Sequence, residues 1–188
     1  MADVIATMPE GPLDAGFIGG GGFTLPRYIN AIRPGSHSVV FEIDAALVDL
    51  VQDELGLEPS ADLEVIVDDA RLSLRDLPDD SLDLMVGDAF GSLSVPWHLT
   101  THEFIDEIDR VLRPGGVYVI NVIDYPPLEF VEAETATLLE VFAHVGVIAP
   151  YRYLDGGSGG NFVLVASQSP VAWDGVQAGL NERSLNEI

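Results

Sequence analysis

The sequence predicts an α/β protein with a mostly parallel seven-stranded sheet, helices on both faces and an antiparallel hairpin at the C-terminal end. Two observations support this class. Strand-like and helix-like runs alternate along almost the whole chain of 188 residues, which is typical of parallel strands joined by helical crossovers. The last two strand-like runs are also close enough in sequence to pair as a hairpin. With 47% hydrophobic residues, the chain can bury the core of one domain.

Seven short, mainly apolar runs are the expected strands. They span residues 15–18, 38–42, 63–67, 82–87, 117–123, 147–153 and 161–167. The loop at residues 155–160 joins the last two runs, and we therefore expect these two strands to pair antiparallel.

The intervening runs are compatible with helices. They span residues 25–32, 45–55, about 101–112 and 128–143, with a shorter segment around 71–74. In the second of these runs, Leu47, Leu50, Val51 and Leu55 have helical spacing. Thr100 is the expected N-cap of the helix near residue 101, and Glu103 completes a capping box three residues later.

A run of four glycines follows the first expected strand and is the most informative motif. Glycine has no Cβ, so a ligand can approach the backbone closely, and positive φ angles carry no penalty. An acid, Glu42, ends the second expected strand, where it can accept hydrogen bonds from a ribose diol. The run consists of Gly19, Gly20, Gly21 and Gly22. This arrangement predicts a site for a cofactor that contains a nucleoside.

The glycine run does not fit a dinucleotide site. In the pattern G-x-G-x-x-G, the third glycine would fall at Thr24 or Leu25. A phosphate loop is excluded as well, because that motif needs a lysine and the chain has none. A cofactor without a pyrophosphate fits better, and S-adenosylmethionine is the leading candidate.

Further candidate residues follow other strands. Ligands of open α/β sheets bind beyond the carboxyl ends of the strands, so we expect Asp69 and Asp88 to lie on the same rim as the glycines and Glu42. Asp124 and Tyr125 follow the fifth strand and are candidates for substrate contact.

The loop after the fourth strand holds two more candidates, His98 as a border of the substrate site and Trp97 as an apolar wall. Ordinary loop packing is the alternative for both. His98 and His102 are four residues apart, but a cap at Thr100 would leave His98 outside the helix, and no metal site is expected.

The net charge of −23, from 31 acidic residues against 8 arginines, excludes nucleic acid as an expected partner. A cationic small molecule would instead be attracted, although the acidity can equally serve solubility or salt tolerance. The chain has no cysteine, which rules out disulfides and thiolate chemistry. It has neither an apolar run of the roughly 18 residues that span a bilayer nor a basic N-terminal signal, so we expect a cytoplasmic protein without a membrane partner.

Several segments together resemble the catalytic domain of the spermidine synthases, which are polyamine aminopropyltransferases. They are GFIGGGGFTLPRY, VVFEID, VDDARLSL, GDAF followed by SVPWHLTTHEF, VLRPGGVYVINV and GNFVLVAS. The glycine turn and the acid are shared with class I S-adenosylmethionine-dependent methyltransferases in general. The resemblance implies their Rossmann-like fold over residues 14–168, with a short extension at 1–13 and an acidic tail at 169–188.

The resemblance also implies roles for individual residues. The four glycines would line the amino-acid portion of the cofactor, and Glu42 would bind the ribose hydroxyls. Asp69 and Ala70 would contact the adenine. Asp88 matches the first acid of the family's D-x-x-D loop and would accept a proton from the attacking amine. The donor would be S-adenosylmethionine or its decarboxylated form, and the product S-adenosylhomocysteine or methylthioadenosine, with no metal required.

The chain departs from this family at three points. The second acid of D-x-x-D falls at Gly91, and Asp68 stands where the family usually has glycine. The family's N-terminal β-hairpin domain, which helps to close the polyamine pocket and to build a homodimer, has no match in the dozen or so residues before the first strand. Three hypotheses stay open: an aminopropyltransferase acting on an amine, a methyltransferase acting on an unknown small molecule, or a non-catalytic nucleoside-binding homologue.

Overall fold

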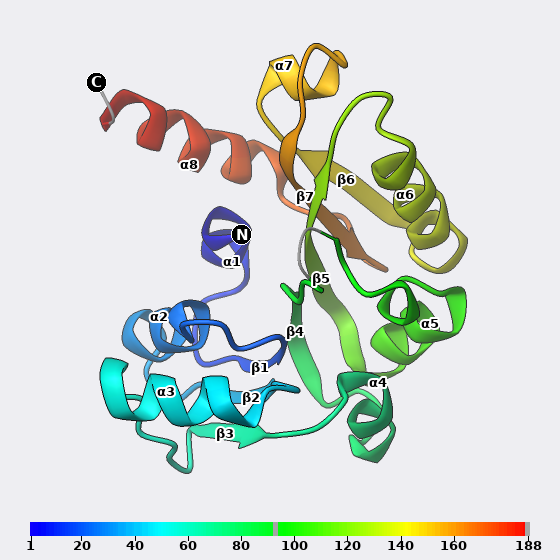
Figure 1. The fold of residues 1–188 in the computed structure, drawn as a ribbon. Coiled ribbons are helices and arrows are strands. Elements are labelled where there is room, and N and C mark those ends of the chain that lie inside the picture. Colours follow the sequence, from blue (N-terminus) through cyan, green and yellow to red (C-terminus); the bar gives the residue numbers. More distant parts are fainter. Residues whose placement is uncertain (92–93, 187–188) are drawn as a thin grey trace.

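A seven-stranded sheet organises residues 1–91 and 94–186, which this computed structural model describes (Figure 1). The strand order is β3-β2-β1-β4-β5-β7-β6. The strands are β1 (Asp14–Ile18), β2 (His37–Phe41), β3 (Leu63–Ile66), β4 (Leu82–Gly87), β5 (Leu112–Asp124), β6 (His144–Ile148) and β7 (Gly160–Ser167). The pairs among β1 to β5 are parallel, whereas β7 is antiparallel to β5 and β6. The predicted α/β class and its closing antiparallel pair are confirmed.

Helices cover both faces of this sheet (Figure 1). One face carries α1 (Ala2–Thr7), α2 (Thr24–Ile32), α3 (Ala45–Leu55) and α8 (Trp173–Asn186), and the other carries α4 (Ala70–Ser73), α5 (His102–Val111) and α6 (Glu129–Val141). Successive strand residues point to opposite faces, so the strands feed two apolar cores. On β5, Tyr118 packs in the core beneath α5 and α6, whereas Val119 packs in the core on the α2 face.

The sixth strand differs from the prediction. It spans His144–Ile148 rather than residues 147–153, and Tyr151–Leu154 form a short helix, α7. The pairing of β6 with β7 runs from His144 opposite Ser167 to Ile148 opposite Val163. Pro150 then follows as the N-cap of α7, because proline cannot donate to a strand ladder but is compatible with the start of a helix.

The N-cap of α5 is also one residue away from the prediction. Thr101, not Thr100, accepts the hydrogen bond from the Phe104 amide, at 3.3 Å. The Thr100 hydroxyl instead donates to the Trp97 carbonyl at 2.9 Å, which closes the 3₁₀ turn η2 (Trp97–Leu99). Hydrogen bonds from the Glu103 amide and the Thr101 hydroxyl lower the pKa of Glu103.

Both ends of the described chain are helical. α1 and α8 pack together, and Val4, Ile5 and Val176 contribute to the core on the α2 face. α8 lies within residues 169–188, which were expected to be an acidic tail. The boundaries at 13/14 and 168/169 stay predictions. Among the described helices, none combines the length and the apolar character needed to cross a membrane.

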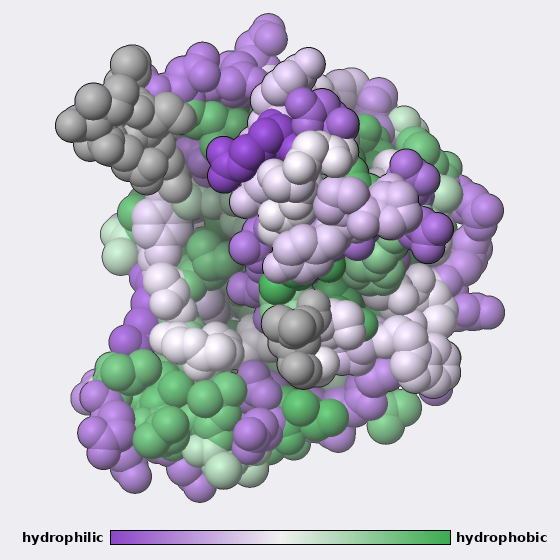
Figure 2. Space-filling model, turned by 45° about the horizontal axis from the view of Figure 1, so that its top comes forward, coloured by the Kyte–Doolittle hydropathy of each residue, from purple (hydrophilic) through white to green (hydrophobic). Residues whose placement is uncertain are grey.

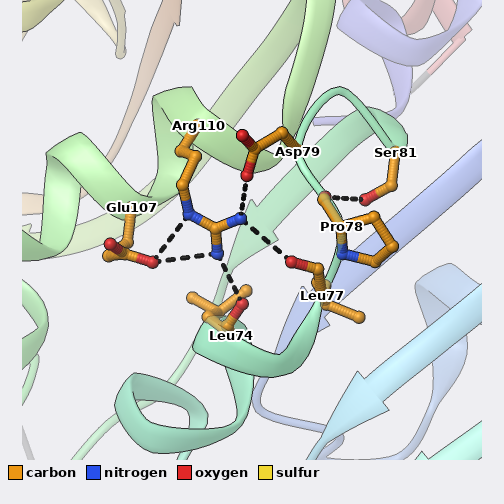
Figure 3. Close-up of polar contacts among 7 residues, drawn as sticks. All are labelled: Leu74, Leu77, Pro78, Asp79, Ser81, Glu107 and Arg110. Carbon is orange, nitrogen blue, oxygen red and sulfur yellow. Dashed lines mark hydrogen bonds and ion pairs between the residues drawn. The ribbon is translucent and has the colours of Figure 1, made fainter.

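Arg110 connects α5 by hydrogen bonds to the segment that precedes β4 (Figure 3). Its guanidinium donates to the carbonyls of Leu74 and Leu77, both at 2.9 Å, and to Asp79 at 2.6 Å. It also pairs with Glu107, one turn earlier on α5. The hydrogen bond to Asp79 and the pairing with Glu107 raise the pKa of Arg110. This contact fixes α5 beside the sheet just before the chain enters β5.

Candidate active site

The candidate site lies where the order of the strands reverses. From β1 the chain proceeds to β2 and β3 on one side, and it then crosses to β4 on the other side of β1. Open α/β sheets bind ligands beyond the carboxyl ends of the strands at such a point. The glycine turn follows β1 and Asp88 follows β4, so the structure brings the two together there. The Asp88 amide donates to the Ile18 carbonyl at 2.9 Å.

Close backbone contacts shape the glycine turn. Gly19 has a φ of +91°, and a Cβ at this position would lie 2.7 Å from the Asp88 carbonyl oxygen. A Cβ on Gly20 would lie 2.5 Å from the ring of Phe23, which is buried at the start of α2. Gly21 also has a positive φ, but its Cβ position faces open space. The turn therefore requires glycine for its own geometry and presents bare backbone to a ligand.

Glu42 connects the glycine turn with the start of α3. The residue is buried, with 7% of its surface exposed, and each carboxylate oxygen accepts one backbone hydrogen bond. Oε2 accepts from the Gly20 amide at 2.8 Å, and Oε1 accepts from the Asp44 amide at 2.9 Å. A carboxylate oxygen can accept a second hydrogen bond, so Glu42 retains capacity for ligand hydroxyl groups.

A cavity of about 430 Å³ opens between the carboxyl ends of β1, β2, β3 and β4. This main pocket lies within the range of roughly 300–1,000 Å³ that is typical of small-molecule sites. The predicted residues in its lining are Gly19, Gly21, Glu42, Asp69, Ala70, Asp88 and His98. A neighbouring cavity of about 120 Å³, the glycine cavity, is lined by all four glycines and again by Asp88.

Two acids at the start of α4 line the main pocket. Asp69 is the N-cap of α4, with Oδ1 accepting from the Arg71 amide at 2.9 Å. Its other oxygen lies 3.9 Å from Nε2 of His98, which comes from η2. Asp68 accepts from the Asp69 amide and from the Ser73 hydroxyl. Asp68, which departs from the family pattern, thus stabilises the turn into α4.

An apolar surface flanks the main pocket. Ile43, Leu50 and Leu55 are each more than half exposed. Figure 2 shows a hydrophobic patch over α3, green at the lower left of the view. Ile43 also belongs to the lining of the main pocket. The acidic pocket therefore has an apolar flank on the α3 side.

The permanent charges around the site are all negative. The linings of the main pocket and the glycine cavity contain five acids, namely Glu42, Asp44, Asp68, Asp69 and Asp88. None of the described residues in these two linings is an arginine. Among residues 1–91 and 94–186, no group of three or more His, Asp or Glu residues is arranged to hold a metal ion.

Asp88 contacts a residue that the sequence analysis missed. Nδ2 of Asn121, on β5, donates to Oδ1 of Asp88 at 2.9 Å. Oδ1 of Asn121 is buried and has no hydrogen-bond partner among the described residues. A sequence signal was present, because Asn121 interrupts the otherwise apolar run of residues 117–123.

The remaining predicted residues lie outside both cavities. Trp97 is 75% exposed and packs edge-on against the His98 ring, with 5.8 Å between the centroids. The Asp124 carboxylate accepts from the amide of Tyr125, the next residue, and from the amides of Phe130 and Val131 at the start of α6. Tyr125 is 62% exposed. Substrate contact by Trp97, Asp124 and Tyr125 stays a prediction, and Asp124 has a capping role of its own.

Comparisons with known proteins agree with this fold. A family described as "Methyltransferase domain" matches residues 13–120. A polyamine aminopropyltransferase of Vibrio vulnificus is 32% identical over 127 residues, which are 66% of this chain and 42% of the relative. The chain thus spans less than half the length of that relative.

Solved structures give the same result. The crystal structure of a probable spermidine synthase from Corynebacterium glutamicum superimposes with a TM-score of 0.81 at 34% identity, over 89% of this chain and 60% of that one. Human methyltransferase-like protein 13, solved in complex with SAH, superimposes with a TM-score of 0.79 at 21% identity, over 99% and 90% of the two chains. The expected Rossmann-like class I methyltransferase fold is confirmed. The chain is similar to the polyamine aminopropyltransferases. Because the family match spans more than half of the chain, the chain belongs to the methyltransferase-domain family.

Proposed function

We propose that this protein transfers an aminopropyl group from decarboxylated S-adenosylmethionine to a small amine. The observation that carries this proposal is the sign of the charge around the glycine turn. Asp88 lines both cavities, and arginine is absent from their described linings. The carboxylate of S-adenosylmethionine would therefore meet a like charge without an arginine to pair with it. The decarboxylated donor carries only an ammonium group at that end, which Asp88 attracts.

We assign the nucleoside part of the donor to the main pocket. Glu42 has hydrogen-bonding capacity for the ribose hydroxyls, and Asp69 can accept from the adenine amine beside Ala70. The glycines leave room for the chain that carries the sulfonium. These roles follow the resemblance to the spermidine synthases and are supported by the common position of the residues around one cavity.

The reaction requires a base beside the sulfonium. The lone pair of the acceptor amine attacks the aminopropyl carbon next to sulfur, and the carbon–sulfur bond breaks with its electron pair leaving on sulfur. Neutral methylthioadenosine leaves. Asp88 accepts the proton that the acceptor must lose before attack, because an alkylammonium group has no free lone pair. The acidic surface attracts a cationic acceptor, whereas it repels nucleic acid. A homodimer and a cytoplasmic location stay predictions.

Calorimetric titration tests this proposal. S-adenosylmethionine, its decarboxylated form and methylthioadenosine are titrated separately, and transfer to 1,4-diaminobutane is followed by mass spectrometry. We expect the decarboxylated donor to bind at least about tenfold more tightly than S-adenosylmethionine, a difference of about 1.4 kcal/mol. Binding of none of the three ligands would overturn the proposal.

Methyl transfer to a small molecule is the alternative that one observation favours. The second acid of the D-x-x-D loop is replaced by Gly91, which removes a carboxylate from the acceptor side. In that case S-adenosylmethionine would bind as tightly as the decarboxylated donor, or more tightly, in the same titration.

A further inference from the structure

We infer that Asn121 is a positioning residue that orients the Asp88 carboxylate toward the acceptor amine. This inference rests on the proposed function, because it assigns Asn121 a role in the proton transfer from the amine. Its basis is a single side-chain contact that joins β5 to the end of β4, together with a buried oxygen that this contact leaves without a partner.

The register of the sheet brings the two residues together. In the pairing of β4 with β5, Gly87 lies opposite Ile120, so Asp88 and Asn121 occupy the next positions along the two strands. The contact joins residues 33 positions apart in sequence. Among the described residues, Asn121 is the side chain that donates to the Asp88 carboxylate.

The chemistry of the contact decides the orientation of the amide. A carboxylate can only accept hydrogen bonds, so the NH₂ group of Asn121 must face Asp88 and the amide oxygen must face away. That oxygen is buried without a donor among the described residues, which costs roughly 1–3 kcal/mol. An apolar side chain of similar size would avoid this cost. A polar group that lowers stability in this way, beside the candidate base, indicates a functional rather than a stabilising contact.

The consequence for the reaction is geometric. Asp88 is exposed and lines both cavities, so its side chain has several accessible rotamers unless a neighbour holds it. The bond from Asn121 engages Oδ1 and leaves Oδ2 to accept the proton of the amine. A base held in one orientation lowers the barrier of the chemical step more than it strengthens donor binding.

The test compares Asn121→Leu with the wild type. The variant removes the donor and the unpaired oxygen together at similar volume. We expect kcat for transfer to 1,4-diaminobutane to fall about tenfold or more, with the KM for the donor nearly unchanged and thermal stability equal or higher. Asn30→Leu, the same substitution on α2, is the matched control and leaves kcat unchanged.

A double-mutant cycle shows whether Asn121 acts through Asp88. In an Asp88→Ala background, Asn121→Leu has no further effect on the residual rate if the inference holds. A second measurement follows the Asn121 side-chain amide signals in ¹H–¹⁵N spectra, which shift in Asp88→Ala.

The outcomes separate the two proposals. Suppose that the wild type transfers the aminopropyl group but kcat is unchanged in Asn121→Leu, or that Asn121→Leu lowers the rate equally in the wild-type and Asp88→Ala backgrounds. Either result overturns the role of Asn121 and leaves the proposed function intact. Amide signals that do not move in Asp88→Ala overturn the contact itself. A wild type that transfers nothing to amines overturns the proposed function, and the role of Asn121 in proton transfer with it.

Discussion

Two buried carboxylates, Glu42 and Glu134, differ in how their oxygens are hydrogen-bonded. Glu42 accepts one backbone hydrogen bond from the glycine turn and one from the start of α3, so it holds the pocket together before any ligand binds. The same carboxylate is the proposed ribose anchor. Glu134, on α6, is buried more deeply than Glu42, and one of its oxygens has no partner among the described residues.

Replacing Glu42 should weaken nucleoside binding. Glu42→Ala is expected to lower the affinity for methylthioadenosine at least about tenfold, because hydrogen bonds to a charged group contribute roughly 1.5–3 kcal/mol. Calorimetry measures the loss, and Glu42→Gln, which keeps one acceptor oxygen, should lose less. An affinity that stays the same in Glu42→Ala would refute the ribose assignment.

Glu134 should make stability depend on pH. Burial raises the pKa of Glu134 from 4.5 to about 7. The folded state therefore keeps a proton that the unfolded state releases, so this contribution to stability is fully present below pH 4.5 and is lost as the pH rises through 7. Burial, and then the charge of Glu134, also raise the pKa of Tyr118 well above its usual value.

The variant Glu134→Gln cannot ionise and should stabilise the protein by up to about 3 kcal/mol near pH 8. This gain over the wild type should shrink toward zero near pH 4, where Glu134 is neutral in both states. Urea unfolding at the two pH values measures the difference. An equal gain at both values would contradict the assignment.

At the scale of elements, side chains distant in sequence hold the helices in place. Arg110 joins α5 to the turn before β4, while Asp124 receives the first amides of α6. Both contacts lie next to β5, the strand that carries Asn121. The position of the candidate site thus depends on how α5 and α6 dock beside this strand.

Removing the Arg110 contact should destabilise the fold. Arg110→Ala leaves the carbonyls of Leu74 and Leu77 without their donor, and we expect a loss of about 2 kcal/mol in the free energy of unfolding. Denaturant unfolding provides the measurement. Arg75→Ala, at an exposed arginine in the same turn, is the control and should change stability by less than about 0.5 kcal/mol. Equal effects of the two variants would rule out a specific role of Arg110.

At the scale of the whole molecule, the excess of acids acts on both stability and substrate. A net charge of −23 produces self-repulsion in the compact state, and it also raises the local concentration of cations around the acidic pocket. The acidic lining of the pocket is therefore the local part of an excess of negative charge that belongs to the whole chain.

Salt should stabilise the protein by screening this repulsion. Raising NaCl from about 0.1 M to 1 M shortens the Debye length from roughly 10 Å to 3 Å, and we expect the Tm to rise by several degrees. Near pH 4 many carboxylates are neutral, and the same addition should then have a smaller effect. A Tm that is insensitive to salt at pH 7 would contradict the expectation.

Local patterns in the sequence determined the class of fold and the rim that carries the site. Three patterns predicted them: the alternation of strand-like and helix-like runs, the glycine run and the acids after the strands. Each is a property of a short segment, and the sequence alone therefore contains it. The helix at Ala45–Leu55 and the strand at Leu82–Gly87 were predicted at their observed bounds for the same reason.

Only the tertiary structure decided which of these residues meet. The pair of Asp88 and Asn121 depends on the register between β4 and β5, and the bounds of β6 depend on its pairing with β7. Such contacts join segments far apart in the chain, and no local periodicity encodes them. The main pocket, with its acids and without arginine in its described lining, follows from the reversal of strand order, which places the ends of four strands around one cavity.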